Sequence, residues 1–147
     1  MKILITGARG QLGSDCLRVF RPGHEVVAVD LPEVDIGHAA GVQRLVDDVR
    51  PDWIVNCAAF TDVDGCERER DEAWRVNAEG PRCLAEAAAR RDARLLHLST
   101  DYVFDGQRPP PSPYREEDKP GPRSWYGETK LAGERAVADV TDRFAIV

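Results

Sequence analysis

The chain has 147 residues, of which 42% are hydrophobic and 31% charged, and its formal net charge is −6. This length suits a single domain, and the composition is that of a globular chain and not of a disordered one. Net acidity argues against a protein that coats nucleic acid, and no apolar run approaches the ~20 residues needed to span a bilayer. The apolar start, Lys2–Gly7, is too short for a secretory signal. We therefore expect a cytoplasmic protein that binds neither membrane nor nucleic acid.

The four cysteines form no CxxC pair and no spacing typical of a metal site. Four cysteines could pair in three ways. In a chain without a secretory signal we expect reduced thiols that mostly fill the core.

The hydrophobic pattern alternates between strands and helices along the whole chain. Short apolar runs rich in β-branched residues predict strands, and apolar residues at helical spacing predict the connections between them. The expected strands are Lys2–Thr6, Glu25–Asp30, Trp53–Ala58, Arg94–Leu98 and Arg143–Val147. The expected helices are Gln11–Phe20, a segment from Val42 to about Arg50 that Pro51 stops, a segment from about Arg70 to Arg91 that Gly80-Pro81 kinks or divides, and one that Ser124 or Trp125 opens.

A glycine triplet, Gly7, Gly10 and Gly13, directly follows the first strand and opens the first helix. Alone it could be turn chemistry, but in this context it allows a tight turn and a close backbone approach to a pyrophosphate at the helix amino terminus. Asp30 ends the second strand, 17 residues past Gly13. A carboxylate at this position would accept hydrogen bonds from the hydroxyls of an adenosine ribose. The alternative is an exposed loop aspartate. Motif and alternation together predict an α/β Rossmann-type fold, a doubly wound parallel sheet of about five strands in three α/β/α layers.

Tyr126 and Lys130 form a YxxxK pair on one face of the last helix. A cation there favours the phenolate and lowers the tyrosine pKa toward the range of an acid–base catalyst. YxxxK is common by chance, but Thr100 adds a hydroxyl at the carboxyl end of a strand, where a switch-point crevice would need one. We predict that Tyr126 protonates a carbonyl oxygen, Thr100 hydrogen-bonds it, and Lys130 holds the cofactor ribose.

At these residues the sequence resembles the extended short-chain dehydrogenase/reductase superfamily and, within it, the dTDP-4-dehydrorhamnose reductase family. The resemblance covers nearly the whole chain, and STDYVFDG is its most specific motif. The segments that carry it are Met1–Gly13 (MKILITGARGQLG), Arg50–Asp64 (RPDWIVNCAAFTDVD), Val76–Ala87 (VNAEGPRCLAEA), Ser99–Gly106 (STDYVFDG) and Trp125–Glu134 (WYGETKLAGE).

The resemblance implies NAD(P)H-dependent reduction of the C4 keto group of dTDP-4-dehydro-L-rhamnose to dTDP-L-rhamnose. By position it places Gly10, Gln11 and Leu12 at the pyrophosphate, Asp30, Asp35 and Ile36 around the adenosine, Ala59, Phe60 and Thr61 along the rest of the dinucleotide, and Thr100, Asp101, Tyr126 and Lys130 at the sugar. We see no arginine near Asp30 that selects a 2′-phosphate, so NADH and NADPH both stay open.

Sister families offer alternatives. Nucleotide-sugar dehydratases typically place Asp-Glu after the catalytic threonine, whereas Thr100 is followed by Asp101-Tyr102. Epimerases usually carry a serine-rich segment there, which this chain lacks. A non-catalytic dinucleotide-binding or regulatory module is the remaining alternative.

Members of the resembling family continue past the strand that begins at Arg143 into a region that grips the substrate nucleotide. We interpret residues 1–147 as the NAD(P)-binding domain without that substrate domain, and we expect the chain to bind dinucleotide but reduce little by itself. The strand Arg143–Val147 would be an uncovered edge that invites self-association, as a homodimer or an aggregate. In the resembling family the substrate region also commonly supplies the dimer contacts and any bound magnesium, and we assign no magnesium ligands in this chain.

The segment Arg108–Arg123 holds six prolines. It could be a solvated surface loop, a PxxP ligand or, as its position suggests, a lid beside the active site.

Other conspicuous side chains favour structural roles. His97, amid leucines in mid-strand, fits a structural histidine better than a catalyst, and Asn77 would either order the nicotinamide side or stabilise the helix kink. We expect core or interface positions for Trp53 and Trp74, and a solvated acidic face for Asp62, Asp64 and Glu67.

Overall fold

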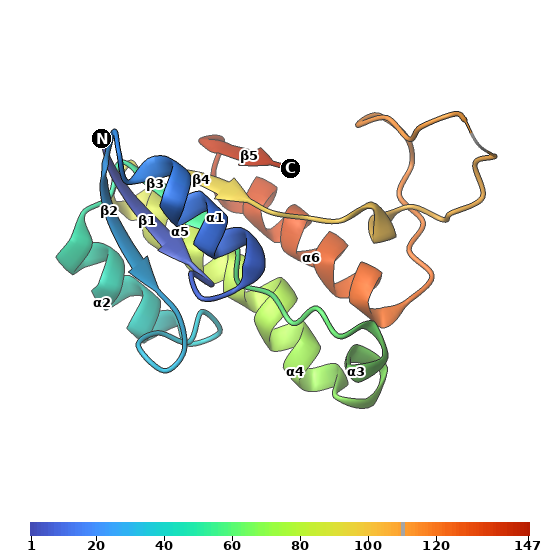
Figure 1. Cartoon of the computed structure of the whole chain (residues 1–147). Helices are drawn as coiled ribbons and strands as arrows, with labels where there is room; N and C mark the ends of the chain where they lie inside the picture. Colours follow the sequence, from blue (N-terminus) through green and yellow to red (C-terminus); the bar gives the residue numbers. More distant parts are fainter. Residues whose placement is uncertain (110) are drawn as a thin grey trace.

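The computed structural model describes residues 1–109 and 111–147 and arranges them around one parallel sheet (Figure 1). Its strands lie in the order β2-β1-β3-β4-β5. They are β1 (Lys2–Thr6), β2 (Glu25–Val29), β3 (Trp53–Asn56), β4 (Arg94–His97) and β5 (Phe144–Ile146). All the predicted strands are present, and those after β1 are shorter than predicted by one or two residues.

The helices also follow the prediction closely, with two additions, α3 and the 3-10 turn η2. They are α1 (Gln11–Phe20), α2 (Ala39–Val49), α3 (Val63–Arg68), α4 (Arg70–Trp74), the π-helical turn η1 (Arg75–Glu79), α5 (Gly80–Arg90), the 3-10 turn η2 (Asp101–Val103) and α6 (Trp125–Val140). Among the described residues, no helix has both the length and the apolar character needed to cross a membrane.

Local chemistry explains where these helices begin and end. α2 ends at Arg50, which adopts a left-handed conformation (φ 51°) just before Pro51. α6 begins after Ser124, whose hydroxyl accepts a hydrogen bond from the backbone N–H of Gly127 at 3.1 Å. α3 was not predicted, because its N-cap, Asp62, lies in a charged stretch of sequence without an apolar helical pattern.

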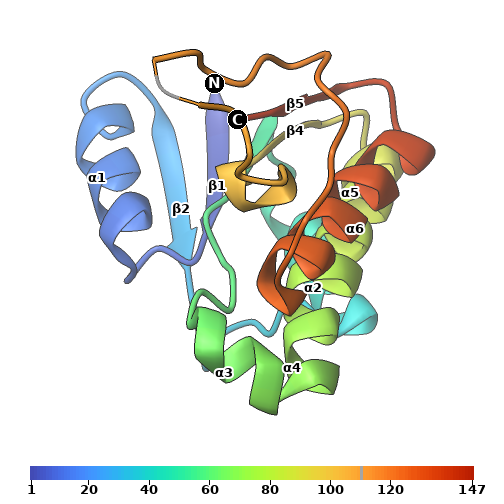
Figure 2. The same cartoon turned by 90° about the vertical axis from the view of Figure 1, so that its right-hand side faces the viewer.

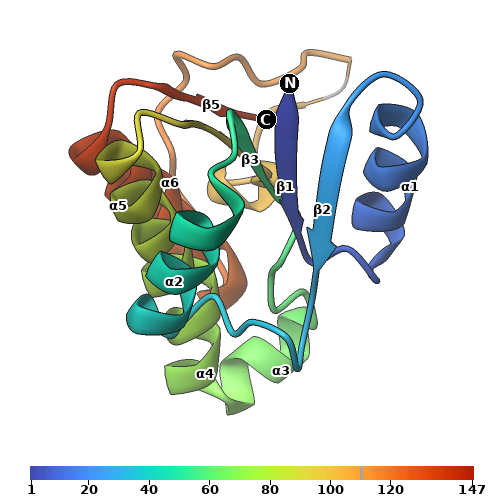
Figure 3. The ribbon, with the colours of Figure 1, turned by 90° about the vertical axis from the view of Figure 1, so that its left-hand side faces the viewer.

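Helices cover both faces of the sheet (Figures 2 and 3). α1 packs on one face, where Ile3, Ile5 and Val55 form the buried centre of an apolar cluster. α2, α5 and α6 pack on the other face, around buried residues that include Leu4 and Ile54. Successive strand residues point to opposite faces, so continuous apolar runs are required to fill both layers. The predicted three-layer Rossmann-type architecture is confirmed.

The chain places its switch point between β1 and β3. From β1 it crosses to β2 on one side, then returns to form β3 on the other side of β1. In open parallel sheets, the crevice at the carboxyl ends of two such strands is where ligands bind. The loops that follow β1 and β3 therefore border the expected binding crevice.

The predicted interruption near Gly80-Pro81 is a single π-helical turn. Pro81 has no N–H to donate to the carbonyl of Asn77 four residues earlier, and the helix widens over Arg75–Glu79 before α5 begins. α6 lies against this turn so closely that a Cβ at Gly133 would overlap the carbonyl oxygen of Asn77. Glycine at 133 thus permits the contact between α6 and the π turn.

β5 forms an edge of the sheet, as predicted. In the part of the chain that the structure describes, β5 pairs with β4 alone, and two of the apolar side chains around it are exposed, Phe144 at 36% and Val147 at 71%. Self-association through this edge remains a prediction.

Candidate functional site

The loop between β1 and α1 is held tightly against the end of β3. Gly7 has a φ of +68°, and a Cβ there would lie 2.5 Å from the backbone nitrogen of Ala58. A Cβ at Gly13 would overlap the Gly7 carbonyl. A Cβ at Gly10, in contrast, would approach only the Gly7 oxygen, at 3.3 Å. Gly7 and Gly13 are therefore required by packing, whereas Gly10 keeps the surface beside the helix amino terminus free of side-chain atoms.

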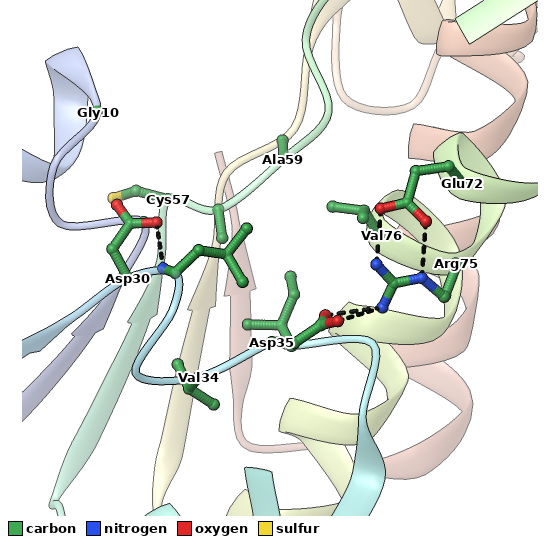
Figure 4. Close-up of a pocket in the computed structure, with 13 residues that line it drawn as sticks. Gly10, Asp30, Val34, Asp35, Cys57, Ala59, Glu72, Arg75 and Val76 are labelled. Carbon is green, nitrogen blue, oxygen red and sulfur yellow. Dashed lines mark hydrogen bonds and ion pairs between the residues drawn. The ribbon is translucent and has the colours of Figure 1, made fainter. Parts of the chain in front are cut away.

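A cavity of about 220 Å³ opens at the ends of β1, β2 and β3 (Figure 4). At one end of it, the carboxylate of Asp30 accepts hydrogen bonds from the backbone N–H groups of Arg9 at 2.8 Å and Leu31 at 2.9 Å. Each carboxylate oxygen keeps a lone pair for a further donor. The lining residues are Gly7, Gly10, Asp30, Leu31, Val34, Asp35, Ile36, Cys57, Ala58, Ala59, Glu72, Arg75 and Val76.

An ion-pair network from the π turn and α4 forms the opposite wall of this cavity (Figure 4). The Arg75 guanidinium donates to both carboxylate oxygens of Asp35 at 2.7 Å, and to Glu72 at 2.6 and 2.8 Å. These bonds lower the pKa of both carboxyl groups. The spacing of Glu72 and Arg75 indicates a pair on one helix face, but Asp35 lies 40 residues from Arg75. The complete network therefore could not be predicted from the sequence.

A second cavity, of about 540 Å³, runs from the amino terminus of α1 to α6. It shares Gly10, Cys57 and Ala59 with the first cavity. Together the two form a path from Asp30 at one end to Tyr126 and Lys130 at the other. The second cavity is lined by Gly10, Gln11, Leu12, Gly13, Asp15, Cys57, Ala59, Thr61, Leu98, Ser99, Tyr126 and Lys130.

Tyr126 and Lys130 are both buried beside this second cavity. Lys130 is 2% exposed, and its ammonium donates to the carbonyl oxygen of Leu98 at 2.6 Å. Burial lowers the Lys130 pKa to about 8, although the Glu134 carboxylate opposes this change. Burial raises the Tyr126 pKa, while hydrogen bonding with the Thr100 side chain opposes the rise. The direction for Tyr126 is opposite to the sequence expectation, because in this structure the loss of solvent outweighs any effect of the nearby cation.

Most of the remaining predicted site residues line one of the two cavities, with exceptions. Thr100 caps the 3-10 turn, where its hydroxyl accepts from the N–H of Tyr102 at 3.3 Å. Asp101 lines a separate hollow of about 290 Å³ with Tyr102 and Arg123. The Phe60 side chain packs in a cluster with Tyr126 and lines neither part of the path.

Asn77 and His97 are fully buried and hold the scaffold of the site. The Asn77 side chain binds the N–H of Phe60 at 2.8 Å and its carbonyl at 3.0 Å, which ties the loop after β3 to the π turn. His97 Nδ1 lies 3.1 Å from the Asn56 amide, and its Nε2 has no hydrogen-bond partner within residues 1–109 and 111–147. Burial, with a smaller contribution from Lys130, lowers the His97 pKa to about 3. The burial of His97 agrees with the structural role that the sequence favoured, and the contacts of Asn77 lie at the helix interruption, one of the two roles left open for it.

The acidic stretch serves as caps and ion pairs. Asp62 caps α3 through the N–H of Gly65 at 2.9 Å. Glu67 accepts from the backbone N–H of Trp125 at 2.7 Å and pairs with Arg70. Residues 1–109 and 111–147 contain no cluster of three or more His, Cys, Asp or Glu side chains that could hold a metal ion.

The proline-rich segment Arg108–Arg123 is anchored by its own contacts, although Pro110 lies outside the described residues. Tyr114 stacks on Phe104 at 4.5 Å and donates to Asp105 at 2.5 Å. Arg108 pairs with Asp118 at 2.6 Å. A lid role for this segment remains a prediction.

The fold and the site together define a Rossmann-like α/β protein with a two-part cavity at its switch point. The chain belongs to the RmlD substrate binding domain family, whose model matches residues 1–147. It is 44% identical to a dTDP-4-dehydrorhamnose reductase of Mycobacterium tuberculosis over 99% of this chain and 48% of that protein. The chain thus spans about half the length of the curated relatives it matches.

Solved structures are similar over the same part of the chain. A dTDP-4-dehydrorhamnose reductase from Clostridium acetobutylicum superposes with a TM-score of 0.96 at 41% identity, over 99% of this chain and 52% of that one. One from Bacillus anthracis, solved in complex with NADP, has a TM-score of 0.95 at 40% identity, over 99% of this chain and 51% of the other.

Proposed function

We propose that the chain binds a nicotinamide dinucleotide along the two joined cavities and contributes to reduction of the C4 keto group of dTDP-4-dehydro-L-rhamnose. The observation that carries this proposal is the path from Asp30, through Gly10, to Tyr126 and Lys130. This path joins a carboxylate suited to ribose hydroxyls, a helix end suited to phosphate and a phenol suited to proton donation. The substrate class is supported by the names of the relatives.

The residues present fit each part of such a ligand. Asp30 retains acceptor capacity for ribose hydroxyls. Gln11, Leu12 and Gly13 form the first turn of α1, whose N–H groups have no partner within the helix and favour a pyrophosphate. The absence of a side chain at Gly10 leaves room for phosphate oxygens beside them.

The nicotinamide end would meet the buried pair on α6. At neutral pH a lysine with a pKa of about 8 is mostly protonated. One N–H of the Lys130 ammonium donates to the carbonyl oxygen of Leu98, and the ammonium has two further N–H groups to offer to ribose hydroxyls.

A bound reduced nicotinamide supplies the hydride. Tyr126 supplies the proton to the oxygen of the keto group, and its raised pKa keeps the phenol protonated before the reaction. Thr100, next to Tyr126, would hydrogen-bond the same oxygen as its charge develops. NADH and NADPH are both candidates for the donor.

The test is to mix the purified chain with NADH or NADPH, add dTDP-4-dehydro-L-rhamnose, and follow the nicotinamide absorbance. Tyr126→Phe should lower substrate-dependent oxidation by about 10²-fold or more, because it removes the general acid. Tyr114→Phe is the matched control, since Tyr114 lies in the proline-rich segment and lines neither cavity. Dinucleotide binding without oxidation would reject reduction by residues 1–147 on their own and show that they act alone as a binding module, the outcome expected from the sequence. Absence of binding would reject both.

A further inference from the structure

Arg9 lies at the Asp30 end of the first cavity, in the tip of the glycine loop. Its backbone N–H donates to Asp30 at 2.8 Å, while its guanidinium contacts the carbonyl oxygen of Leu31 and the carboxylate of Glu33. Contrary to the sequence analysis, an arginine therefore stands beside Asp30. It was missed because 21 residues separate the two along the chain.

We call Arg9, Asp30 and Glu33, at this end of the first cavity, the Asp30 corner; it contains two carboxylates and one guanidinium. Asp30 is positioned for ribose hydroxyls, and a 2′-phosphate in place of the 2′-hydroxyl would bring negative charge next to it. Arg9 is the cation that these contacts place at that corner, and arginine binds phosphate well through its planar fork. In this structure, however, the Arg9 guanidinium is already paired with Glu33.

We infer that the Arg9–Glu33 ion pair sets the balance between NADH and NADPH: NADH is accepted with the pair intact, whereas a 2′-phosphate must displace Glu33 from Arg9. This inference rests on the proposed dinucleotide binding and assigns its selectivity. Both side chains are about half exposed, Arg9 at 59% and Glu33 at 48%, so the exchange needs no change in the core. Arg9 also holds the Glu33 pKa below its usual value, so the competing carboxylate is charged at neutral pH.

The magnitude of the effect follows from the exposure of the pair. Because solvent screens an exposed ion pair, its contribution is small and corresponds to a factor of no more than about five in Kd. Glu33→Gln should therefore improve the Kd for NADPH about two- to fivefold relative to that for NADH. Arg9→Ala keeps the backbone N–H that binds Asp30 but removes the phosphate ligand, and should weaken NADPH relative to NADH by about tenfold.

The experiment is a titration of the full chain with NADH and with NADPH, monitored by nicotinamide fluorescence at constant ionic strength. The variants are Glu33→Gln, Arg9→Ala and the double variant. Glu25→Gln and Arg91→Ala are the matched controls. Glu25 starts β2 and pairs with Lys2, and Arg91 pairs with Asp47 on α2, so both remove an equivalent charge away from the two cavities.

The double variant separates release of Arg9 from a general loss of negative charge. If Glu33 acts by occupying Arg9, Glu33→Gln changes the NADPH-to-NADH Kd ratio in the wild-type background and has little effect in Arg9→Ala. An equal effect in both backgrounds would overturn the inference, as would an unchanged ratio in Glu33→Gln. Failure of the wild-type chain to bind either dinucleotide would instead reject the proposed function, and this inference with it.

Discussion

Protonation of His97 gives the chain a pH-dependent stability that can be worked out from the structure. His97 is fully buried on β4, and its pKa falls from 6.5 to about 3 because burial disfavours the imidazolium. Below pH ~6.5 the unfolded chain binds a proton at this residue that the folded chain does not. Stability therefore falls as pH decreases, by about 1.36 kcal/mol per pH unit. Between about pH 7 and pH 5, we expect His97 to account for a loss of about 2 kcal/mol.

The assay is urea unfolding at the two pH values, for the wild type and His97→Leu. The variant removes the titrating group. Between pH 7 and pH 5, its free energy of unfolding should therefore change by about 2 kcal/mol less than that of the wild type. His38→Gln, which replaces an exposed histidine, is the matched control and should retain the wild-type dependence. If His97→Leu does not fold, the pH dependence of the wild-type free energy of unfolding still tests the prediction. A free energy of unfolding that stays constant between the two pH values would refute the reasoning.

Three further substitutions test the buried lysine, the contact of α6 with the π turn and the β5 edge. Lys130→Met removes a buried ammonium and should raise the free energy of unfolding by about 2 kcal/mol while weakening dinucleotide binding, as measured by urea unfolding and titration; lower stability would contradict this. Gly133→Ala should destabilise the chain by about 2 kcal/mol through its clash with Asn77, whereas Gly23→Ala, with open space around it, should not. Val147→Lys should reduce any self-association through the β5 edge in sedimentation experiments, and unchanged association would exclude that edge.

The predictable part of this molecule is the part encoded locally. The apolar run Lys2–Thr6 and the glycines after it specify a strand, a tight turn and a helix, because each depends on neighbours within a few residues. Ser124 likewise marks the start of α6 through a bond only three residues ahead. The alternation of such units fixes the parallel sheet and its crevice.

The unpredicted part depends on contacts between distant segments. Arg9 and Arg75 reach carboxylates 24 and 40 residues away, and no periodic pattern reports such pairs. The Tyr126 pKa shows a second limit. Helical spacing places Lys130 one turn from Tyr126, but the extent to which solvent is excluded around both is a property of the packed fold.

The most direct test of the proposed site is calorimetric titration of the chain with NADH and NADPH, using Gly10→Ala as the probe. A methyl group at Gly10 meets only the Gly7 oxygen at 3.3 Å, so the fold should tolerate it, yet Gly10 lines both cavities. Gly23→Ala is the control, with nothing near its added methyl. We expect one saturable site in the wild type and in Gly23→Ala, and at least about tenfold weaker binding in Gly10→Ala. Absence of saturable binding in the wild type, or equal affinity in all three proteins, would contradict the site.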